Sequence, residues 1–249
     1  MAAWARDARR VTVLTGAGMS AESGVPTFRD AQTGLWARYD PAELATPEAW
    51  ERDPALVWAW YAWRRTLVRR AEPHAGHRAL ARWQRRAPVR IVTQNVDDLH
   101  ERAGAHVLTH LHGDLFADRC SVCHEPWAGR AAADQEPGRP APARVEPPAC
   151  PGCGGPVRPG VVWFGEALPE GAFDTAVQAV RDADLVLVVG TSGLVHPAAA
   201  LPDLAGARGV PVVEVNPEPS AVSGSADLVW RSTASHALPA LVDALGEVP

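Results

Sequence analysis

The sequence contains no lysine, and all 24 of its basic residues are arginine. Arginine is therefore the only permanent side-chain cation that the protein can place in a binding site. The 29 acidic residues bring the net charge to −5, which gives no broad cationic field for nucleic acid or an anionic membrane. We therefore expect neither of these as the main partner.

Long apolar runs are also missing, since none approaches the 18 or so residues of a membrane-spanning helix. Residues 1–10 contain no apolar signal core ahead of the strand-like segment Val11–Thr15. Hydrophobic residues make up 47% of the 249 residues, enough for the core of one large domain or two modest ones. The sequence predicts a cytoplasmic protein, and we expect it to be a monomer.

Cysteine is scarce, but its four copies form two pairs, Cys120-x-x-Cys123 and Cys150-x-x-Cys153. Four thiolates in such pairs fit a closed tetrahedral zinc site, which leaves no position for a catalytic water. Two disulfides or four free thiols are the alternatives, and the missing secretion signal disfavours the disulfides. We expect one structural zinc ion, with an exposed flexible loop over residues 131–148, which are rich in Pro, Ala and Arg.

Short valine-rich runs recur along the chain and are typical of buried parallel strands: Val11–Thr15, Val89–Thr93, 107–111, Leu185–Val189 and 210–215. Helical stretches at 76–86 and 173–182 separate some of them, which favours a doubly wound α/β sheet. We predict a Rossmann-type domain of residues 1–30, 76–111 and 161–249. A helical module at 31–75 and a zinc module at 112–160 would interrupt it and together form a small domain.

The helical module has its own sequence pattern. Thr46-Pro47-Glu48 predicts a helix start, and Leu56, Trp60, Trp63 and Leu67 recur at helical spacing. Four of the ten tryptophans lie between Trp50 and Trp63. Core packing is the expected role of most of these rings.

Glycine or polar residues follow each of the five strand-like runs. In open α/β sheets, ligands bind beyond the carboxyl ends of the strands, so we expect the active site there. The first of these segments, Gly16-Ala17-Gly18-Met19-Ser20-Ala21, fits the G-x-G-x-x-A fingerprint that admits a dinucleotide pyrophosphate. In a dehydrogenase, a second strand follows and carries an acid for the ribose about 20 residues after the loop. Asp40 lies at about that distance, but it lies in the predicted helical module and not at the end of a strand. The pattern favours NAD used for something other than hydride transfer.

Several segments together resemble the sirtuins, which are NAD-dependent protein lysine deacylases. They run in the family's order from about residue 11 to residue 241: the glycine loop through Arg29, Thr93-Gln94-Asn95-Val96-Asp97, His110-Leu111-His112-Gly113, the two cysteine pairs, Phe164-Gly165-Glu166, Gly190-Thr191-Ser192 and Val215-Asn216. The resemblance implies that NAD and an acyl-lysine protein or peptide meet between the large and the small domain. It implies free lysine, nicotinamide and O-acyl-ADP-ribose as products.

The resemblance also implies roles for individual residues. His112 resembles the catalytic histidine, a base that deprotonates a ribose hydroxyl and suits that step because it titrates near neutrality. Asn95 and Asp97 are grouped with it as catalytic, and the neighbouring His110 is expected to have only a structural role. The residues implied to bind NAD are Gly16, Ala17, Gly18, Ser20, Glu22, Phe28, Arg29, Trp36, Gln94, Asn95, Asp97, Gly190, Thr191, Ser192, Asn216, Glu218 and Ala234.

The substrate peptide is expected to enter as an added strand between residues 163–166 and 193–195, held through its backbone. The residues implied to bind it are Val162, Phe164, Gly165, Glu166 and Gly193. Gly193 departs from the family's usual continuation of the Gly-Thr-Ser loop.

The acyl group is expected to be read by Tyr61 and Arg64, which share a helix face and can converge on one carboxylate. Arg65 could do the same by spacing alone, and a solvated arginine face is the plainer alternative. The resemblance chooses Arg64, because Tyr61-x-x-Arg64 and residues 161–166 look like the branch that removes succinyl and malonyl groups.

Three rival functions remain open from the sequence. The first is an ADP-ribosyltransferase or NAD hydrolase that uses the same pocket. The second is a zinc-ribbon nucleic-acid binder, disfavoured because the segment between the cysteine pairs carries Arg130, Arg139 and Arg144 but few aromatics for stacking. The third is a conventional oxidoreductase.

Overall fold

The computed structural model describes residues 1–26, 40–129 and 144–246. Its centre is a parallel sheet with the strand order β3-β2-β1-β6-β7-β8. The strands are β1 (Val11–Thr15), β2 (Val89–Thr93), β3 (Val107–His110), β6 (Leu185–Val189), β7 (Val212–Val215) and β8 (Leu228–Trp230). The predicted fold class is confirmed.

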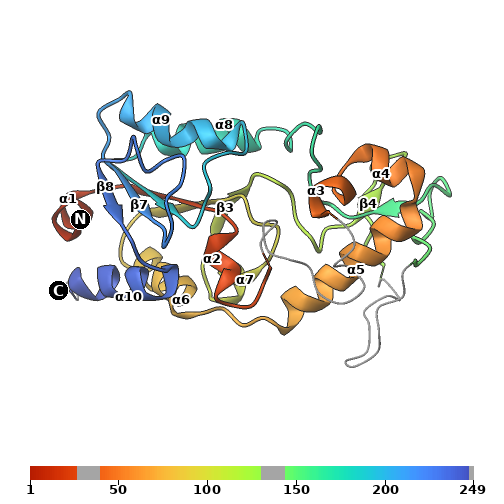
Figure 1. Ribbon diagram of the computed structural model, residues 1–249, viewed down its shortest axis with the longest axis horizontal. Coiled ribbons are helices and arrows are strands. Elements are labelled where there is room, and N and C mark those ends of the chain that lie inside the picture. Colours follow the sequence, from red (N-terminus) through yellow and green to blue (C-terminus); the bar gives the residue numbers. More distant parts are fainter. Residues whose placement is uncertain (27–39, 130–143, 247–249) are drawn as a thin grey trace.

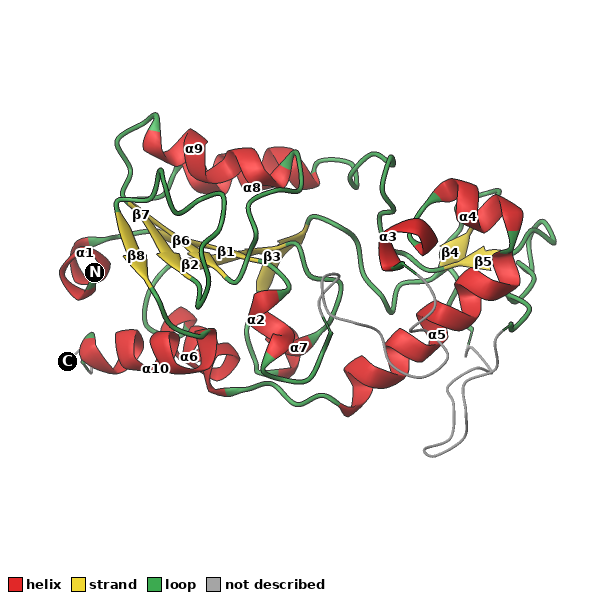
Figure 2. Ribbon diagram, viewed as in Figure 1, coloured by secondary structure: helices red, strands yellow, loops and turns green. Residues whose placement is uncertain are grey.

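Both faces of this sheet are buried, which explains why its strands read as continuous apolar runs. In β6, Leu185, Leu187 and Val189 pack into one core cluster while Val186 and Val188 pack into another on the opposite face. Helices α6 (Ala75–Gln84) and α10 (Ala234–Ala244) cover the first face, and α8 (Ala172–Arg181) and α9 (Leu201–Gly206) cover the second (Figure 2). The described residues of this part also form α1 (Ala2–Asp7), α2 (Gly18–Ala21) and α7 (Leu99–Arg102), with a 3-10 turn at Ala198–Ala200.

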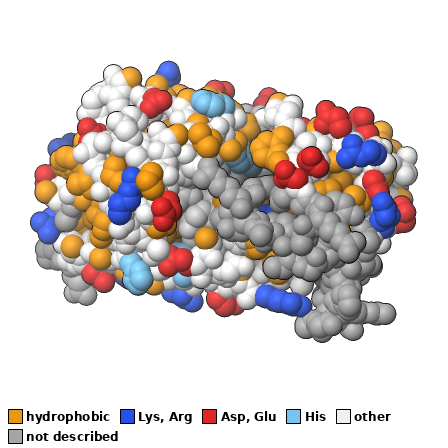
Figure 3. All heavy atoms as spheres, in the orientation of Figure 1, with side chains coloured by type: hydrophobic (Ala, Val, Ile, Leu, Met, Phe, Trp, Pro, Cys, Tyr) orange, Lys and Arg blue, Asp and Glu red, His pale blue; other side chains and the backbone are white. Residues whose placement is uncertain are grey.

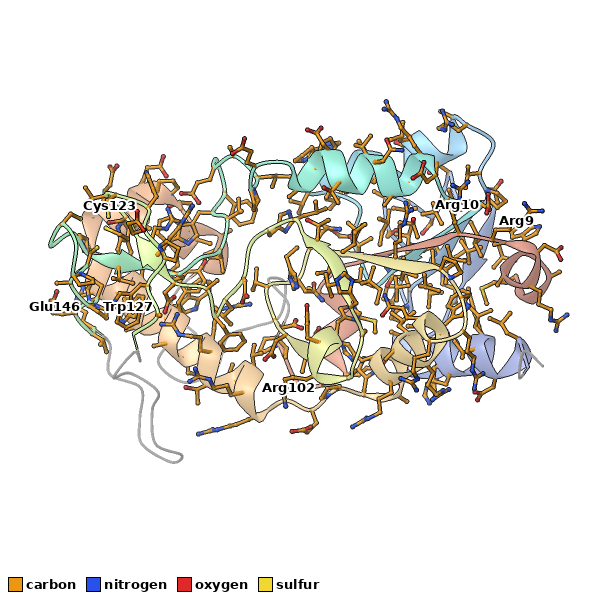
Figure 4. All side chains as sticks on the ribbon, turned by 180° about the vertical axis from the view of Figure 1, so that it is seen from behind. Arg9, Arg10, Arg102, Cys123, Trp127 and Glu146 are labelled. Atoms are coloured by element: carbon orange, nitrogen blue, oxygen red, sulfur yellow. The ribbon has the colours of Figure 1, made fainter. Side chains whose placement is uncertain are left out.

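A second, smaller lobe lies beyond the β3 side of the sheet (Figure 1). It contains α3 (Pro41–Leu44), α4 (Pro47–Arg52), α5 (Pro54–Arg70) and a two-stranded sheet of β4 (Arg119–Cys120) and β5 (Val157–Arg158). Figure 4 shows Cys123, Trp127 and Glu146 at this end of the molecule, with Arg9 and Arg10 at the other end.

The helices and the cysteine knuckles of the small lobe share one core. Trp50, Trp58 and Trp60 pack in the same buried cluster as Cys120 and Cys150. Val161 and Trp163 also belong to this cluster, although the predicted boundary assigned them to the large domain. The boundaries of the two domains therefore remain a prediction, while the shared core is a property of the fold.

Thr46 caps α4 as expected, accepting a hydrogen bond from the Ala49 N–H at 3.1 Å.

Helix α5 is buried on more sides than its predicted stripe. Of the predicted stripe on α5, Trp60 is buried, but Leu56, Trp63 and Leu67 are only half-buried.

Arg64 and Arg65 of α5 do not lie on a solvated face. Arg64 and Arg65 are both buried, and Arg65 forms an ion pair with Asp118 at 2.9 Å. This pair joins α5 to the segment that leads into the first cysteine knuckle.

Within the described residues, no helix combines the length and apolarity needed to cross a membrane. Among the side chains coloured in Figure 3, acidic and basic groups are interspersed over the visible face. This distribution agrees with the modest net charge of −5.

Candidate active site

The glycine loop packs against the end of β6 with almost no room for side chains. The Gly18 N–H donates to the carbonyl of Gly190 at 2.7 Å, and a Cβ on Gly18 would lie 2.7 Å from the same oxygen. A Cβ on Gly16 would lie 2.8 Å from the Cβ of Thr191, and Gly190 itself has a φ of +61°. Only glycine allows this close approach. The loop lies at the carboxyl ends of the strands, the edge outside which the ligand crevice of an open α/β sheet lies.

A buried polar network lies beside this loop. The hydroxyl of Ser20 accepts a hydrogen bond from Asn95 Nδ2 at 3.2 Å and is also hydrogen-bonded to Asp97. All three residues are buried, and burial raises the pKa of Asp97 above that of an ordinary aspartate. The sequence-predicted Ser20, Asn95 and Asp97 are therefore brought together at the ends of β1 and β2.

His112 lies at the same edge of the sheet, just beyond the end of β3. Its Nδ1 lies 3.0 Å from the carbonyl of Gln94, an acceptor, so Nδ1 carries the proton and Nε2 is left as a base. Burial lowers the pKa of His112, which keeps the ring neutral at neutral pH. The Gln94 side chain in turn donates to the hydroxyl of Thr191 at 3.1 Å. These contacts hold a neutral histidine in one tautomer beside the crevice.

Two further strand ends complete the crevice. Asn216, after β7, donates from Nδ2 to the carbonyl of Thr191 at 2.9 Å, and Ser192 accepts from the Ala221 N–H at 3.0 Å. Glu218 has an exposed side chain, and its carbonyl accepts from Arg231 at 2.9 Å. Ala234 is buried in the core at the start of α10.

Glu22 binds across this edge to Ser235. Its carboxylate accepts from the Ser235 backbone N–H at 3.0 Å and from the hydroxyl at 2.6 Å. Burial acts to raise the pKa of Glu22, but these hydrogen bonds outweigh it and lower the pKa. The other three predicted NAD-binding residues of this region, Phe28, Arg29 and Trp36, lie outside the described residues.

The predicted peptide-binding segments are partly exposed. The Val162 N–H donates to the carbonyl of His112 at 2.8 Å, so this segment is tied to the histidine. Phe164 and Leu194 expose 45% and 62% of their surface, unusual for large apolar side chains beside a crevice. The Gly193 N–H approaches the Thr191 hydroxyl at 3.3 Å.

The Glu166 side chain is held within the protein. Arg158 binds its carboxylate through two hydrogen bonds of 2.5 and 2.9 Å, and the Trp163 N–H donates to it at 2.8 Å. A contact of Glu166 and Gly165 with a peptide would therefore come from their backbone.

Tyr61 and Arg64 lie together within the small lobe, close to Asp97. Both are buried, and the Tyr61 hydroxyl accepts a hydrogen bond from Trp163 Nε1 at 3.0 Å. Burial lowers the pKa of Arg64, while Tyr61 and the carboxyl of Asp97 act in the other direction. Arg65, the alternative by spacing, is already engaged by Asp118.

The four cysteines converge as predicted. All four Sγ atoms lie within 4.8 Å of one another, with Cys120–Cys153 at 3.5 Å and Cys123–Cys150 at 3.7 Å. Zinc–sulfur bonds of about 2.3 Å place the sulfurs of a tetrahedral site about 3.8 Å apart, whereas a disulfide needs about 2.05 Å. The cluster fits one structural zinc ion, which would fold and hold the knuckles together.

Sequence reasoning missed Glu214, which organises the loop that carries Asn216. Its carboxylate is 1% exposed and is bound by Ser220, by Ser223 at 2.6 Å and by Arg231 at 3.2 Å. The available signal was an acid inside the valine-rich β7, since a buried charge needs dedicated partners.

A Rossmann-type sheet with a closely packed glycine loop at the carboxyl end of β1 is typical of the α/β proteins that bind dinucleotides. Within that class, the comparison with known families is specific, because a family model described as "Sir2 family" matches residues 16–197. The chain belongs to the Sir2 family.

Individual relatives are similar along nearly their whole length. An NAD-dependent protein deacylase of Mycobacterium tuberculosis is 57% identical over 237 residues, which cover 95% of this chain and 98% of the relative. One of Corynebacterium glutamicum is 54% identical over 244 residues, covering 97% and 93%. The crystal structure of a Sir2 homologue with NAD superposes with a TM-score of 0.89 at 42% identity, covering 98% of this chain and 92% of that one.

Proposed function

We infer that the protein is an NAD-dependent protein lysine deacylase, and we propose that it prefers succinyl and malonyl groups over acetyl. The deacylase names of the relatives, at up to 57% identity, support the activity. A Sir2 structure with a p53 peptide and NAD, 25% identical with a TM-score of 0.80, supports an acylated peptide or protein as the substrate.

NAD would bind along the glycine-lined crevice. Gly16, Ala17, Gly18 and Ser20 would face its phosphates, with Thr191, Ser192, Asn216 and Glu218 toward its adenosine half and Gln94, Asn95 and Asp97 toward the nicotinamide half. When bound, NAD supplies a ribose that accepts the acyl group and a nicotinamide that can leave. The residues of the chain would bind and orient it.

His112 would act as the general base. Its Nδ1–H is held by the Gln94 carbonyl at 3.0 Å, so Nε2 is free to take a proton from a hydroxyl in the crevice. The lowered pKa of His112 supports this role, because the base is already neutral at pH 7.

The preference for acidic acyl groups depends on one observation: the phenol of Tyr61 and the guanidinium of Arg64 are buried together near Asp97. A carboxylate is the natural ligand of a guanidinium, and a phenol beside the guanidinium can donate a further hydrogen bond to the same carboxylate. Arg65 forms an ion pair with Asp118, whereas Arg64 lies beside Tyr61, the residue with which the resemblance pairs it.

The test compares kcat/KM for succinyl-lysine and acetyl-lysine versions of one peptide in Arg64→Met and in the wild type. Loss of a charge-assisted bond of about 1.5 to 3 kcal/mol predicts a fall of about 10- to 100-fold on the succinyl peptide. The acetyl peptide has no carboxylate, so its kcat/KM is expected to change little.

Arg70→Met, which removes an exposed arginine at the end of the same helix, is the matched control and is expected to leave both substrates unaffected. An Arg64→Met enzyme that retains desuccinylation contradicts the proposed preference. Transfer of ADP-ribose to protein, without O-acyl-ADP-ribose among the products, would instead favour the rival ADP-ribosyltransferase.

A further inference from the structure

Two histidines of β3 and its continuation hold the same stretch of backbone. His110 is the last residue of β3, and His112 lies in the turn that follows it. His110 Nδ1 lies 2.9 Å from the carbonyl of Asn95, and His112 Nδ1 lies 3.0 Å from the carbonyl of Gln94. The two rings therefore clamp consecutive peptide groups at the edge of the crevice.

The two histidines differ in the partner of their second nitrogen. His110 Nε2 lies 2.8 Å from the carboxylate of Glu101. Glu101 is on α7, next to Arg102, which is labelled in Figure 4. A backbone carbonyl and a carboxylate only accept hydrogen bonds, and a neutral imidazole has only one N–H. Both contacts are satisfied together only when His110 is an imidazolium.

The charged groups around His110 favour this form. Glu101 on α7 and Asp114 beyond β3 are the acidic neighbours that raise its pKa. His110 also interacts electrostatically with Asp97, in the loop after β2, and with His100 on α7. Burial acts to lower the pKa of His110, but the bonds to Glu101 and Asn95 and the two acidic neighbours outweigh it and raise the pKa. The end of β3 and the turn after it thus carry one histidine kept charged, His110, and one kept neutral, His112.

We propose that His110, as an imidazolium paired with Glu101, is a positioning residue that fixes the Asn95 backbone and with it the Ser20–Asn95–Asp97 network of the crevice. The proposal rests on the deacylase activity inferred above and not on the acyl preference. His110 itself touches neither substrate; it acts through the loop that it clamps.

The proposal predicts a direction for the pH dependence. Because the pKa of His110 is raised, its positioning effect is fully present below pH 6.5, the ordinary value for histidine, and is lost as the pH rises through the higher value. The lowered pKa of His112 sets the acidic limb of the profile, because the base becomes active as the pH rises through a value below 6.5. We therefore expect a bell-shaped pH profile for kcat/KM with respect to NAD.

The experiment measures kcat and KM for NAD from about pH 6 to pH 10 in the wild type, His110→Gln, Glu101→Gln and the control His106→Gln, which alters an exposed histidine just before β3. Loss of one charge-assisted bond predicts a fall of about tenfold in kcat/KM for NAD at pH 7 in His110→Gln, with the alkaline limb removed. Glu101→Gln is expected to shift the alkaline limb to lower pH, and His106→Gln to match the wild type.

The outcomes separate this proposal from the function on which it rests. A wild type that does not deacylate any acyl-lysine peptide overturns the function. An active wild type whose alkaline limb is unchanged in both His110→Gln and Glu101→Gln overturns the clamp. If His110→Gln does not fold, the alkaline limb of Glu101→Gln tests the proposal alone. The Glu101 side chain is 42% exposed and Gln has nearly the same size, so we expect this variant to fold.

Discussion

At the scale of single residues, the hydroxyl of Tyr61 has a fixed direction. It accepts the indole N–H of Trp163 at 3.0 Å, and the guanidinium of Arg158 lies over the Trp163 ring at 3.4 Å. A hydroxyl that already accepts on one side turns its own hydrogen elsewhere. Trp163 therefore orients Tyr61 as a donor, the role required for an acyl carboxylate.

Trp163→Phe removes this N–H and keeps an aromatic ring in the core. With Tyr61 free to rotate, kcat/KM on a succinyl peptide is expected to fall by a factor of about 3 to 10, the scale of one neutral hydrogen bond, with a smaller effect on an acetyl peptide. Trp50→Phe is the matched control, because Trp50 packs 5.6 Å from Trp163 in the same cluster. An equal loss on both peptides, or the same loss in both variants, would attribute the effect to packing alone.

Spacing alone could not choose between Arg64 and Arg65, nor assign a use to His110. Both arginines lie within one helical turn of Tyr61, and only the position of Asp118, far along the chain, removes Arg65 from the choice. His110 likewise gains its significance from Glu101 and the Asn95 carbonyl. The residues predicted correctly are those fixed by local motifs, and the ambiguous ones depend on tertiary partners.

At the scale of elements, the strands with strong valine runs were predictable. Val11–Thr15, Val89–Thr93 and Leu185–Val189 coincide with the observed β1, β2 and β6, and the run at 210–215 contains the shorter β7. The three-residue β8 is only half-buried and has no such run, and α10 contains Pro239, which normally signals a helix end. Such elements are stabilised by tertiary contacts, so the local sequence does not predict them.

The zinc module and α5 are expected to fail together when the metal is removed. The Arg65–Asp118 pair and the shared core connect the cysteine knuckles to the helix that carries Tyr61 and Arg64. Zinc binding worth about 10 to 16 kcal/mol is comparable with the roughly 5 to 15 kcal/mol that stabilises a whole domain. A chelator is therefore expected to lower the Tm and abolish deacylation, and added zinc to restore both.

Cys150→Ser is expected to reproduce the chelator effect and to lower the zinc content, measured by elemental analysis, from one ion per chain. Chelated protein that keeps its Tm and its activity, or a zinc-free protein as purified that is fully active, would contradict a structural zinc.

At the scale of the whole molecule, the absence of lysine has a consequence for an enzyme of this kind. A lysine deacylase without lysine offers no side-chain amine of its own, so it cannot be acylated there or compete as its own substrate. It also leaves arginine as the only permanent cation for an acidic acyl group, and Arg64 is the buried arginine near Asp97.

The decisive experiment incubates the wild type with NAD and one peptide that carries either succinyl-lysine or acetyl-lysine, and measures kcat/KM together with the products. We expect nicotinamide and O-acyl-ADP-ribose from both peptides, with the higher kcat/KM on the succinyl peptide. An equal or higher kcat/KM on the acetyl peptide would contradict the proposed preference, and NAD consumption without O-acyl-ADP-ribose would contradict the deacylase itself.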